Sequence, residues 1–226
     1  MIRKVIQRIK LYRSLHFFQY LYLNHFCKNV IRTDQSRIFP YKNAVLDMAT
    51  TAKIILGGGD IELGCDLMKG SRTETRVRLR DHAVWSSEGG CKIYYGATVE
   101  LLHHAVLDSQ YFTLNTGSTL VAAKRIQLGH DVMIGRSVVI YDSDHHTLLN
   151  AQGETANPDA PVVIGDHVWL ATHVTVLKGS HIGSGSMVAA NAVVHGSIAP
   201  ETLVQTVHEV RTRENYGGWN RVHPKE

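Results

Sequence analysis

The chain has 226 residues, of which 44% are hydrophobic and 19% charged, and its formal net charge is +4. This composition is ordinary for a globular protein, and the length suits one domain with appendages. No apolar run is long enough to cross a membrane as a helix, and no signal-peptide pattern opens the chain. The cysteines Cys27, Cys65 and Cys91 are scattered, without a CxxC pair. This pattern disfavours a disulfide framework or a zinc knuckle and predicts a cytoplasmic location.

Residues 1–43 are expected to form a basic, amphipathic, helical N-terminal segment. Residues 1–37 hold eight Lys or Arg side chains against one acid, Asp34. Apolar residues recur there at helical spacing: Ile2, Val5, Ile6 and Ile9. Two interpretations stay open: residues 1–37 bind peripherally to the inner face of a membrane, or the helix covers an open end of the fold. Nucleic-acid binding is not expected, because no recognition motif and no basic stripe in the second half accompany this charge.

An aliphatic residue returns at every sixth position through much of the second half of the chain. These residues are Leu128, Ile134, Ile140, Ile164, Leu170, Val176, Ile182, Val188 and Val194. A period of six fits neither an α-helix nor a simple strand alternation, but it is typical of a solenoid in which each hexad makes one short strand and one turn. The sequence therefore predicts an all-β solenoid over 44–206, with looser hexads up to about residue 125. Residues 207–226 are predicted to be a C-terminal tail.

A polar stretch interrupts the hexads between Ile140 and Ile164. The aliphatic positions resume in the same register after it, so a loop is expected to leave the solenoid and return without disturbing the stack. This loop carries Asp142, Asp144, His145 and His146. Functional residues concentrate on loops held by rigid scaffolds, which favours a site here over a plain surface insertion.

Two stretches carry a family resemblance: VVIGDHVWLATHVTVLKGSHIGSGSMVAANAVV and VMIGRSVVIYDSDHH. They resemble the hexapeptide-repeat acyltransferases, specifically the branch that O-acetylates sugars and bacterial surface polysaccharides. The resemblance covers about 126–215. It implies a left-handed parallel β-helix, a homotrimer, acetyl-CoA as co-substrate without a metal, and a sugar or polysaccharide hydroxyl as acceptor.

The resemblance also implies a general base in the polar loop. Acetyl transfer to an alcohol needs a base for the hydroxyl proton, and histidine has a suitable ordinary pKa. The family pattern I-x-D-x-D-x-H, counted from Ile140, indicates His146, with His145 as the alternative. Asp142 or Asp144 is then expected to orient the imidazole; the alternative is that these aspartates only make turns.

The family pattern further assigns residues to the acetyl-CoA groove. Trp169 is expected beside the active site. Small residues are expected to leave room for the pantetheine arm and to present backbone amides to it: Ala171, Thr172, Ala189 and Ala190. Gly196 replaces a lysine that often meets the coenzyme A phosphates in relatives. The expected phosphate contact is therefore Lys178, Arg211 or Arg213, and His195 is also assigned to the cofactor site. The alternative is that this part of the pocket has decayed.

Three rival functions remain open. N-acetyl transfer to an amino sugar would use the same base and groove. A non-catalytic solenoid scaffold would fail to bind acetyl-CoA. A γ-type carbonic anhydrase would bind zinc through histidines, and His167 and His173 lie six residues apart. Six is also the hexad period, however, and the H-x4-H step of that family is absent, so no metal is expected.

Overall fold

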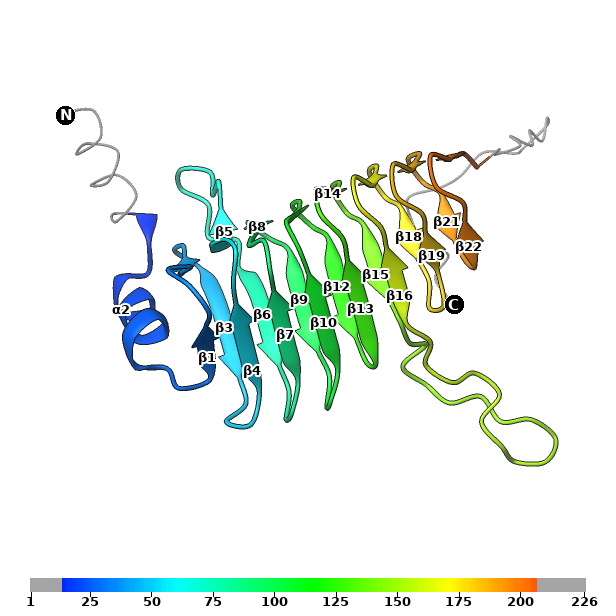
Figure 1. Ribbon diagram of the computed structural model, residues 1–226, viewed down its shortest axis with the longest axis horizontal. Coiled ribbons are helices and arrows are strands. Elements are labelled where there is room, and N and C mark those ends of the chain that lie inside the picture. Colours follow the sequence, from blue (N-terminus) through cyan, green and yellow to red (C-terminus); the bar gives the residue numbers. More distant parts are fainter. Residues whose placement is uncertain (1–13, 207–226) are drawn as a thin grey trace, which may run out of the picture.

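The structure is a computed structural model that describes residues 14–206. The chain winds into a three-sided parallel β-helix, in which each strand pairs with the strand one coil before it and one coil after it (Figure 1). The predicted all-β solenoid is confirmed. Because consecutive strands belong to different sheets, the chain turns a corner after almost every strand.

Each of the three sheets takes every third strand in turn. Sheet 1 contains β1 (Val30–Arg32), β4 (Lys53–Leu56), β7 (Val84–Ser87), β10 (Val106–Ser109), β13 (Arg125–Leu128), β16 (Val162–Ile164), β19 (His181–Ile182) and β22 (Ser197–Ile198). Sheet 2 contains β2 (Ile38–Pro40), β5 (Ile61–Cys65), β8 (Cys91–Tyr94), β11 (Phe112–Leu114), β14 (Val132–Ile134), β17 (Trp169–Leu170), β20 (Met187–Val188) and β23 (Leu203–Val204). Sheet 3 contains β3 (Ala44–Met48), β6 (Thr75–Leu79), β9 (Thr98–Leu101), β12 (Thr119–Ala122), β15 (Val139–Tyr141), β18 (Thr175–Val176) and β21 (Val193–Val194).

The hexad aliphatic residues form the core as predicted. Val163 pairs with His181 across sheet 1, and 181 − 163 = 18, so three hexads complete one coil. In sheet 2, Ile134, Leu170 and Val188 stack directly above one another. All nine predicted aliphatic positions are buried. Full burial of such a side chain is worth about 1.5–3 kcal/mol, so the stacked ladders stabilise the coils without long strands.

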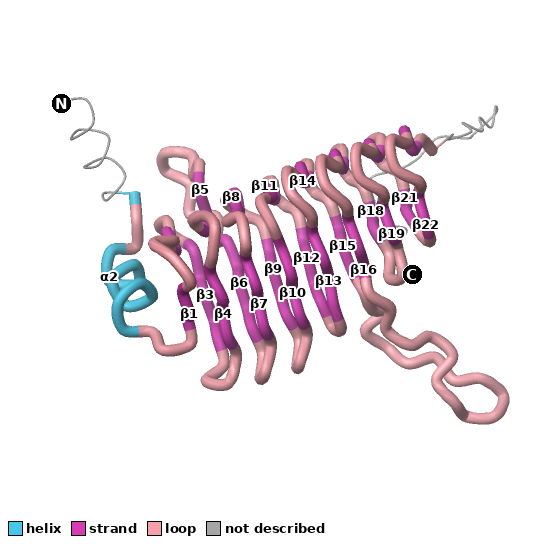
Figure 2. The backbone as a smooth tube through the Cα atoms, in the orientation of Figure 1, coloured by secondary structure: helices cyan, strands magenta, loops and turns pink. Residues whose placement is uncertain are grey.

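The first half of the solenoid has longer strands than the second half, as Figure 2 shows. Its core also holds larger side chains, among them Trp85 and Phe112, which are fully buried. The indole Nε1 of Trp85 donates a hydrogen bond to Ser109 Oγ at 3.1 Å, which satisfies its polar atom inside the core. Larger core residues require wider coils, which explains why the hexads are looser in this half.

The solenoid begins earlier than the predicted boundary at residue 44. β1 pairs with β4 and β2 pairs with β5, so the first coil starts at Val30. Val30 and Ile38 are buried at the start of these strands, although basic residues surround them in the sequence. The expectation that residues 1–43 are helical throughout is therefore corrected, because these inward residues belong to the first coil.

A short helical segment covers the open end of the first coil. It consists of α2 (Phe17–Leu21) and one π-helical turn, η1 (Tyr22–Phe26). Tyr20 and Leu23 of this segment are buried, and the centre of the Tyr20 ring lies 5.5 Å from that of Phe39 in β2. Within the described residues, the helix thus acts as a cap.

The helix expected around Ile2–Ile9 and the predicted tail 207–226 lie outside the described residues. Among the residues that are described, no helix is long and apolar enough to cross a membrane.

Candidate functional site

The polar loop leaves the solenoid at the corner between sheets 3 and 1, after β15, and returns at β16. It projects well beyond the neighbouring corners of the solenoid (lower right in Figure 1). Because the loop leaves at a corner, Leu128 still pairs with Ile164 and Ile140 with Val176, so neither sheet loses its register. The predicted in-register insertion is confirmed.

Asp142 anchors the start of this loop to the preceding coil. Its carboxylate is fully buried and accepts three backbone N–H groups, from Ala123 at 2.6 Å, Lys124 at 2.8 Å and Arg125 at 2.6 Å. Three donors compensate a charge that burial would otherwise penalise. The expectation that Asp142 orients a catalytic histidine is therefore corrected, because both carboxylate oxygens are engaged by the backbone.

Asp144 holds the two sides of the loop together. Its Oδ2 accepts hydrogen bonds from Lys178 Nζ and from Asn157 Nδ2, each at 2.7 Å. Lys178 also donates to the carbonyl oxygen of Asn157 at 2.9 Å. The prediction for Asp144 is corrected as well: it bonds to these two residues and not to an imidazole. Lys178, a predicted phosphate contact, has its ammonium occupied by the loop.

Lys178 also changes the acidity of Asp144. The hydrogen bond from Lys178, followed by that from Asn157, lowers the pKa of the Asp144 carboxyl below its ordinary value. Because the folded pKa is the lower one, this contact stabilises the folded loop above the carboxyl's ordinary pKa. Its contribution disappears as the pH falls through the lowered pKa.

Lys178→Met is therefore expected to raise the pKa of Asp144 toward its ordinary value. The pKa is measured by carbon-detected NMR titration of the carboxyl group in the wild-type protein and in the variant. Lys124→Met is the matched control, because the Lys124 ammonium donates only to the Asp159 carbonyl of the same loop, at 3.3 Å, and not to Asp144. An unchanged Asp144 pKa in Lys178→Met would contradict the contact.

His145 and His146 lie at the base of the loop, beside a hollow of about 280 Å³. His145 has left-handed backbone (φ 61), its N–H donates to Ser143 Oγ at 2.9 Å, and its ring meets the edge of the Tyr141 ring. The His146 carbonyl accepts a hydrogen bond from Asn157 Nδ2 at 2.9 Å. Both side chains are exposed, and no described residue hydrogen-bonds to either ring. The backbone is fixed, and the imidazoles are left open to a ligand.

The predicted groove residues lie at a different corner, between sheets 2 and 3. Ala171 donates its N–H to Val188 O at 2.9 Å, so it stacks one coil away from Ala189. Thr172 and Ala190 are exposed beside them. The full width of sheet 3 separates this corner from the loop. One chain therefore brings Ala171, Thr172, Ala189 and Ala190 together but does not bring them to the histidines.

The remaining predicted site residues also lie on different faces of the solenoid. Trp169 lies on sheet 2 with 45% of its surface exposed. His195 is exposed on the corner between sheets 3 and 1, one coil beyond Lys178. Arg211 and Arg213 lie outside the described residues.

His167 and His173 occupy corner positions with left-handed backbone, which accounts for their spacing without a metal. His167 Nδ1 lies 2.7 Å from Asp131 Oδ2. Within residues 14–206, no group of three or more His, Cys, Asp or Glu side chains is arranged to hold a metal ion.

The outer face of sheet 2 carries an apolar column that the sequence reasoning missed. Met133 pairs with Trp169, Trp169 with Met187, and Met187 with Leu203. Each residue directly precedes an inward aliphatic residue, so it points outward. That position in the hexad is the signal that could have revealed the column. Met133, Trp169 and Leu203 are exposed and Met187 is half-buried, and a contiguous apolar surface of this kind marks an interaction surface.

Comparison with known families identifies the repeat. Residues 161–196 match the family model described as bacterial transferase hexapeptide (six repeats). The matched segment contains β16 to β21, the part of the solenoid where three hexads complete each coil. The predicted resemblance to hexapeptide-repeat acyltransferases is therefore confirmed.

Curated relatives align with part of the chain. WbbJ of Escherichia coli (strain K12) is 35% identical over 98 residues, which cover 39% of this chain and 50% of WbbJ. The polysialic acid O-acetyltransferase of Neisseria meningitidis is 38% identical over 69 residues, 30% of this chain and 32% of that protein. The galactoside O-acetyltransferase of Escherichia coli (strain K12) is 27% identical over 112 residues, 46% of this chain and 54% of that protein. The aligned part thus spans about half of these relatives or less.

Solved structures show a looser likeness. The superposition on the polySia-specific acetyltransferase NeuO covers 88% of this chain and 92% of the NeuO chain, at 16% sequence identity and a TM-score of 0.45. The hexapeptide-repeat acetyltransferase VCA0836 of Vibrio cholerae was solved with acetyl coenzyme A. Its superposition covers 50% of this chain and 58% of the VCA0836 chain, at 26% sequence identity and a TM-score of 0.31. Because both TM-scores are low, the description of the fold rests on this chain's own strand pairing.

Proposed function

We propose that this protein is an acetyl-CoA-dependent O-acetyltransferase that acts on a hydroxyl of a sugar, in a bacterial surface polysaccharide or its precursor. The observation that carries the proposal is the hexapeptide-transferase repeat of residues 161–196, which directly follows an exposed loop with two open histidine side chains. Relatives named as O-acetyltransferases align with part of this chain, which supports O-transfer to a saccharide.

The proposed reaction is a direct transfer. His146 accepts the proton of the sugar hydroxyl as its oxygen attacks the thioester carbonyl of acetyl-CoA. Backbone N–H groups stabilise the tetrahedral oxyanion. The C–S bond then breaks, the acetyl group stays on the sugar oxygen, and the leaving thiolate of coenzyme A takes the proton from His146, which restores the base. Thiolate is a good leaving group, so this route requires neither a metal nor a covalent enzyme intermediate.

The site is proposed to be completed by a neighbouring copy of the chain. Within one chain, the histidines and the groove residues lie at opposite edges of sheet 3. The apolar column of Met133, Trp169, Met187 and Leu203 offers a surface for a second copy. A homotrimer closed by this surface would place Trp169 and the groove of one chain beside the histidine loop of the next.

Met187→Glu is expected to dissociate the trimer, because it places a charge in the middle of the apolar column. Gln127→Glu is the matched control, since Gln127 is an exposed outward residue on sheet 1. Light scattering coupled to size-exclusion chromatography gives the mass of each protein. A trimeric Met187→Glu variant, or a monomeric wild-type protein with full activity, would contradict this assembly.

The proposed activity is tested by incubating the purified protein with acetyl-CoA and a set of saccharide acceptors. Release of the coenzyme A thiol and the mass of one added acetyl group on the saccharide are followed together. Transfer to neutral sugars supports the proposal, whereas transfer confined to amino sugars would indicate N-acetylation. A protein that does not bind acetyl-CoA would indicate a scaffold.

A further inference from the structure

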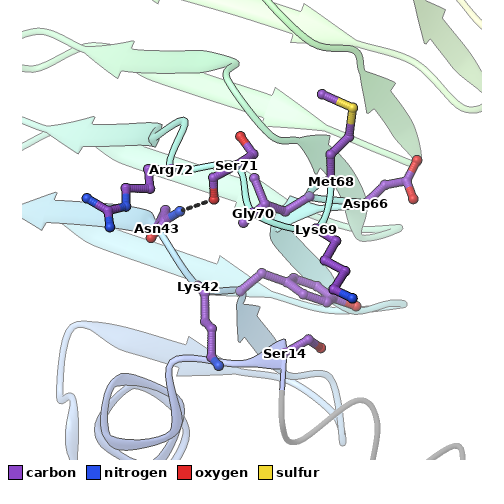
Figure 3. A pocket seen from close by; sticks show the side chains of 11 residues that line it. Ser14, Lys42, Asn43, Asp66, Met68, Lys69, Gly70, Ser71 and Arg72 are labelled. Atoms are coloured by element: carbon purple, nitrogen blue, oxygen red, sulfur yellow. Dashed lines mark hydrogen bonds between the residues drawn. The ribbon is translucent and has the colours of Figure 1, made fainter.

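The N-terminal end of the solenoid contains a basic cavity that the proposed reaction does not use. The cavity has a volume of about 1190 Å³ and lies between the corner that joins β2 to β3, the loop 66–74 and the start of the cap. Lys42, Lys69 and Arg72 line it, against one acid, Asp66. Figure 3 shows Lys42 and Lys69 extending to the same side of the hollow, toward the segment with Ser14, while Arg72 lies at another edge.

These three cations lack partners within residues 14–206. No described residue forms a hydrogen bond or an ion pair with the side chain of Lys42, Lys69 or Arg72. Several other basic side chains of the solenoid are paired, for example Arg78 with Asp47 and Lys92 with Glu62. A cavity with three unpaired cations and one carboxylate keeps a net positive charge and therefore favours an anionic group.

An aromatic surface adjoins the cavity. Capping the first coil accounts for Tyr20 and Leu23, which are buried, but not for four aromatic side chains on the outer side of the cap. These are Phe17, Phe18, Tyr22 and Phe26, of which Phe18 is 79% and Phe26 is 72% exposed. A second hollow, of about 600 Å³, is lined by Phe18 and Tyr22. Asn43 lines both hollows, so the aromatic and the basic surfaces are continuous.

We propose that this end of the protein docks on an anionic lipid bilayer, with the aromatic side chains in the headgroup region and a lipid phosphate in the basic cavity. Exposed aromatic residues beside lysine and arginine are the combination that binds a membrane surface without spanning it. Ser14 also lines the cavity.

The same charges disfavour a second copy of the chain as the occupant. A symmetric contact through this end would bring the cations of one copy against those of the other, because a two-fold interface presents the same patch twice. A surface of phosphate headgroups complements these charges and also accepts the aromatic rings.

The test is co-sedimentation of the full-length protein with vesicles. One set contains phosphatidylcholine alone, and the other contains phosphatidylcholine with phosphatidylglycerol. The wild-type protein should sediment with the anionic vesicles only. Each basic residue near an anionic surface is worth a factor of about five in partitioning, so Lys42→Glu/Lys69→Glu should bind at least tenfold more weakly. Phe18→Ser should also bind more weakly, and its loss should persist at high salt, where the charge contribution is screened.

Lys53→Glu is the matched control, because Lys53 is an exposed cation on β4, in sheet 1 and away from the cavity, and its side chain has no partner among the described residues. Its binding should stay within about twofold of wild type. Circular dichroism confirms that each variant is folded. The proposal is overturned if the wild-type protein does not bind anionic vesicles, or if Lys42→Glu/Lys69→Glu binds them as strongly as Lys53→Glu does. It is also overturned if Phe18→Ser leaves vesicle binding intact but changes the oligomer mass, which would assign the aromatic surface to a contact between copies.

Discussion

Replacing His146 with alanine is expected to lower the rate of acetyl transfer by about 10²–10⁴-fold, the usual contribution of a positioned general base. Acetyl-CoA binding should change little, because the imidazole acts on the acceptor hydroxyl and not on the coenzyme. The rate of coenzyme A release in the presence of a saccharide acceptor measures the first quantity, and calorimetric titration measures the second.

His145→Ala is the control for this experiment. The two histidines are adjacent and both are exposed, but the His145 ring packs against the Tyr141 ring and its backbone adopts the left-handed conformation. We expect a smaller loss of rate for His145→Ala than for His146→Ala. If His145→Ala abolished turnover and His146→Ala did not, the roles would be exchanged. If neither mattered, this loop would not be the site.

Asp142→Ala is expected to give the largest loss of stability among substitutions in the loop, about 3 kcal/mol. Hydrogen bonds to a charged group contribute roughly 1.5–3 kcal/mol each, and a donor left unsatisfied adds its desolvation cost. The alanine would remove the acceptor of three backbone N–H groups at once. Urea unfolding of the variant and of the wild-type protein at neutral pH gives the difference in the free energy of unfolding.

Two variants calibrate this result. Asp142→Asn keeps one acceptor oxygen, so its loss should be intermediate. Asp144→Ala removes an exposed carboxylate and should cost much less, because exposed ion pairs contribute little. Equal losses for Asp142→Ala and Asp144→Ala would mean that the buried carboxylate does not anchor the loop.

The solenoid could be predicted from the sequence because its core depends on one repeated position. Each of the nine aliphatic hexad residues between Leu128 and Val194 is buried, and a period of six residues is compatible with few other folds. The start of the solenoid was missed because Val30 and Ile38 lie in a basic segment with irregular spacing. Coil width there is set by side chains such as Trp85, which periodicity alone does not report.

The site was predicted less completely than the fold. Motif spacing indicated the loop and its histidines, but it could not distinguish an aspartate that bonds to the backbone from one that bonds to an imidazole. Asp142 and Asp144 differ in burial, and burial depends on the corner of the preceding coil. The separation of Ala190 from His146 depends on which corner each hexad reaches, a feature of the assembled coils.

The central claim is that acetyl transfer occurs at sites shared between copies of the chain, and mixing two inactive variants tests it directly. Ala190→Trp should block the coenzyme groove, and His146→Ala removes the base; each protein alone should be nearly inactive. When the two are unfolded together and refolded as mixed trimers, each shared site has about one chance in four of receiving an intact histidine and an intact groove. The mixture should therefore recover about a quarter of wild-type activity. A mixture as inactive as its components, with mixed trimers shown by mass spectrometry, would contradict a site shared between neighbouring chains.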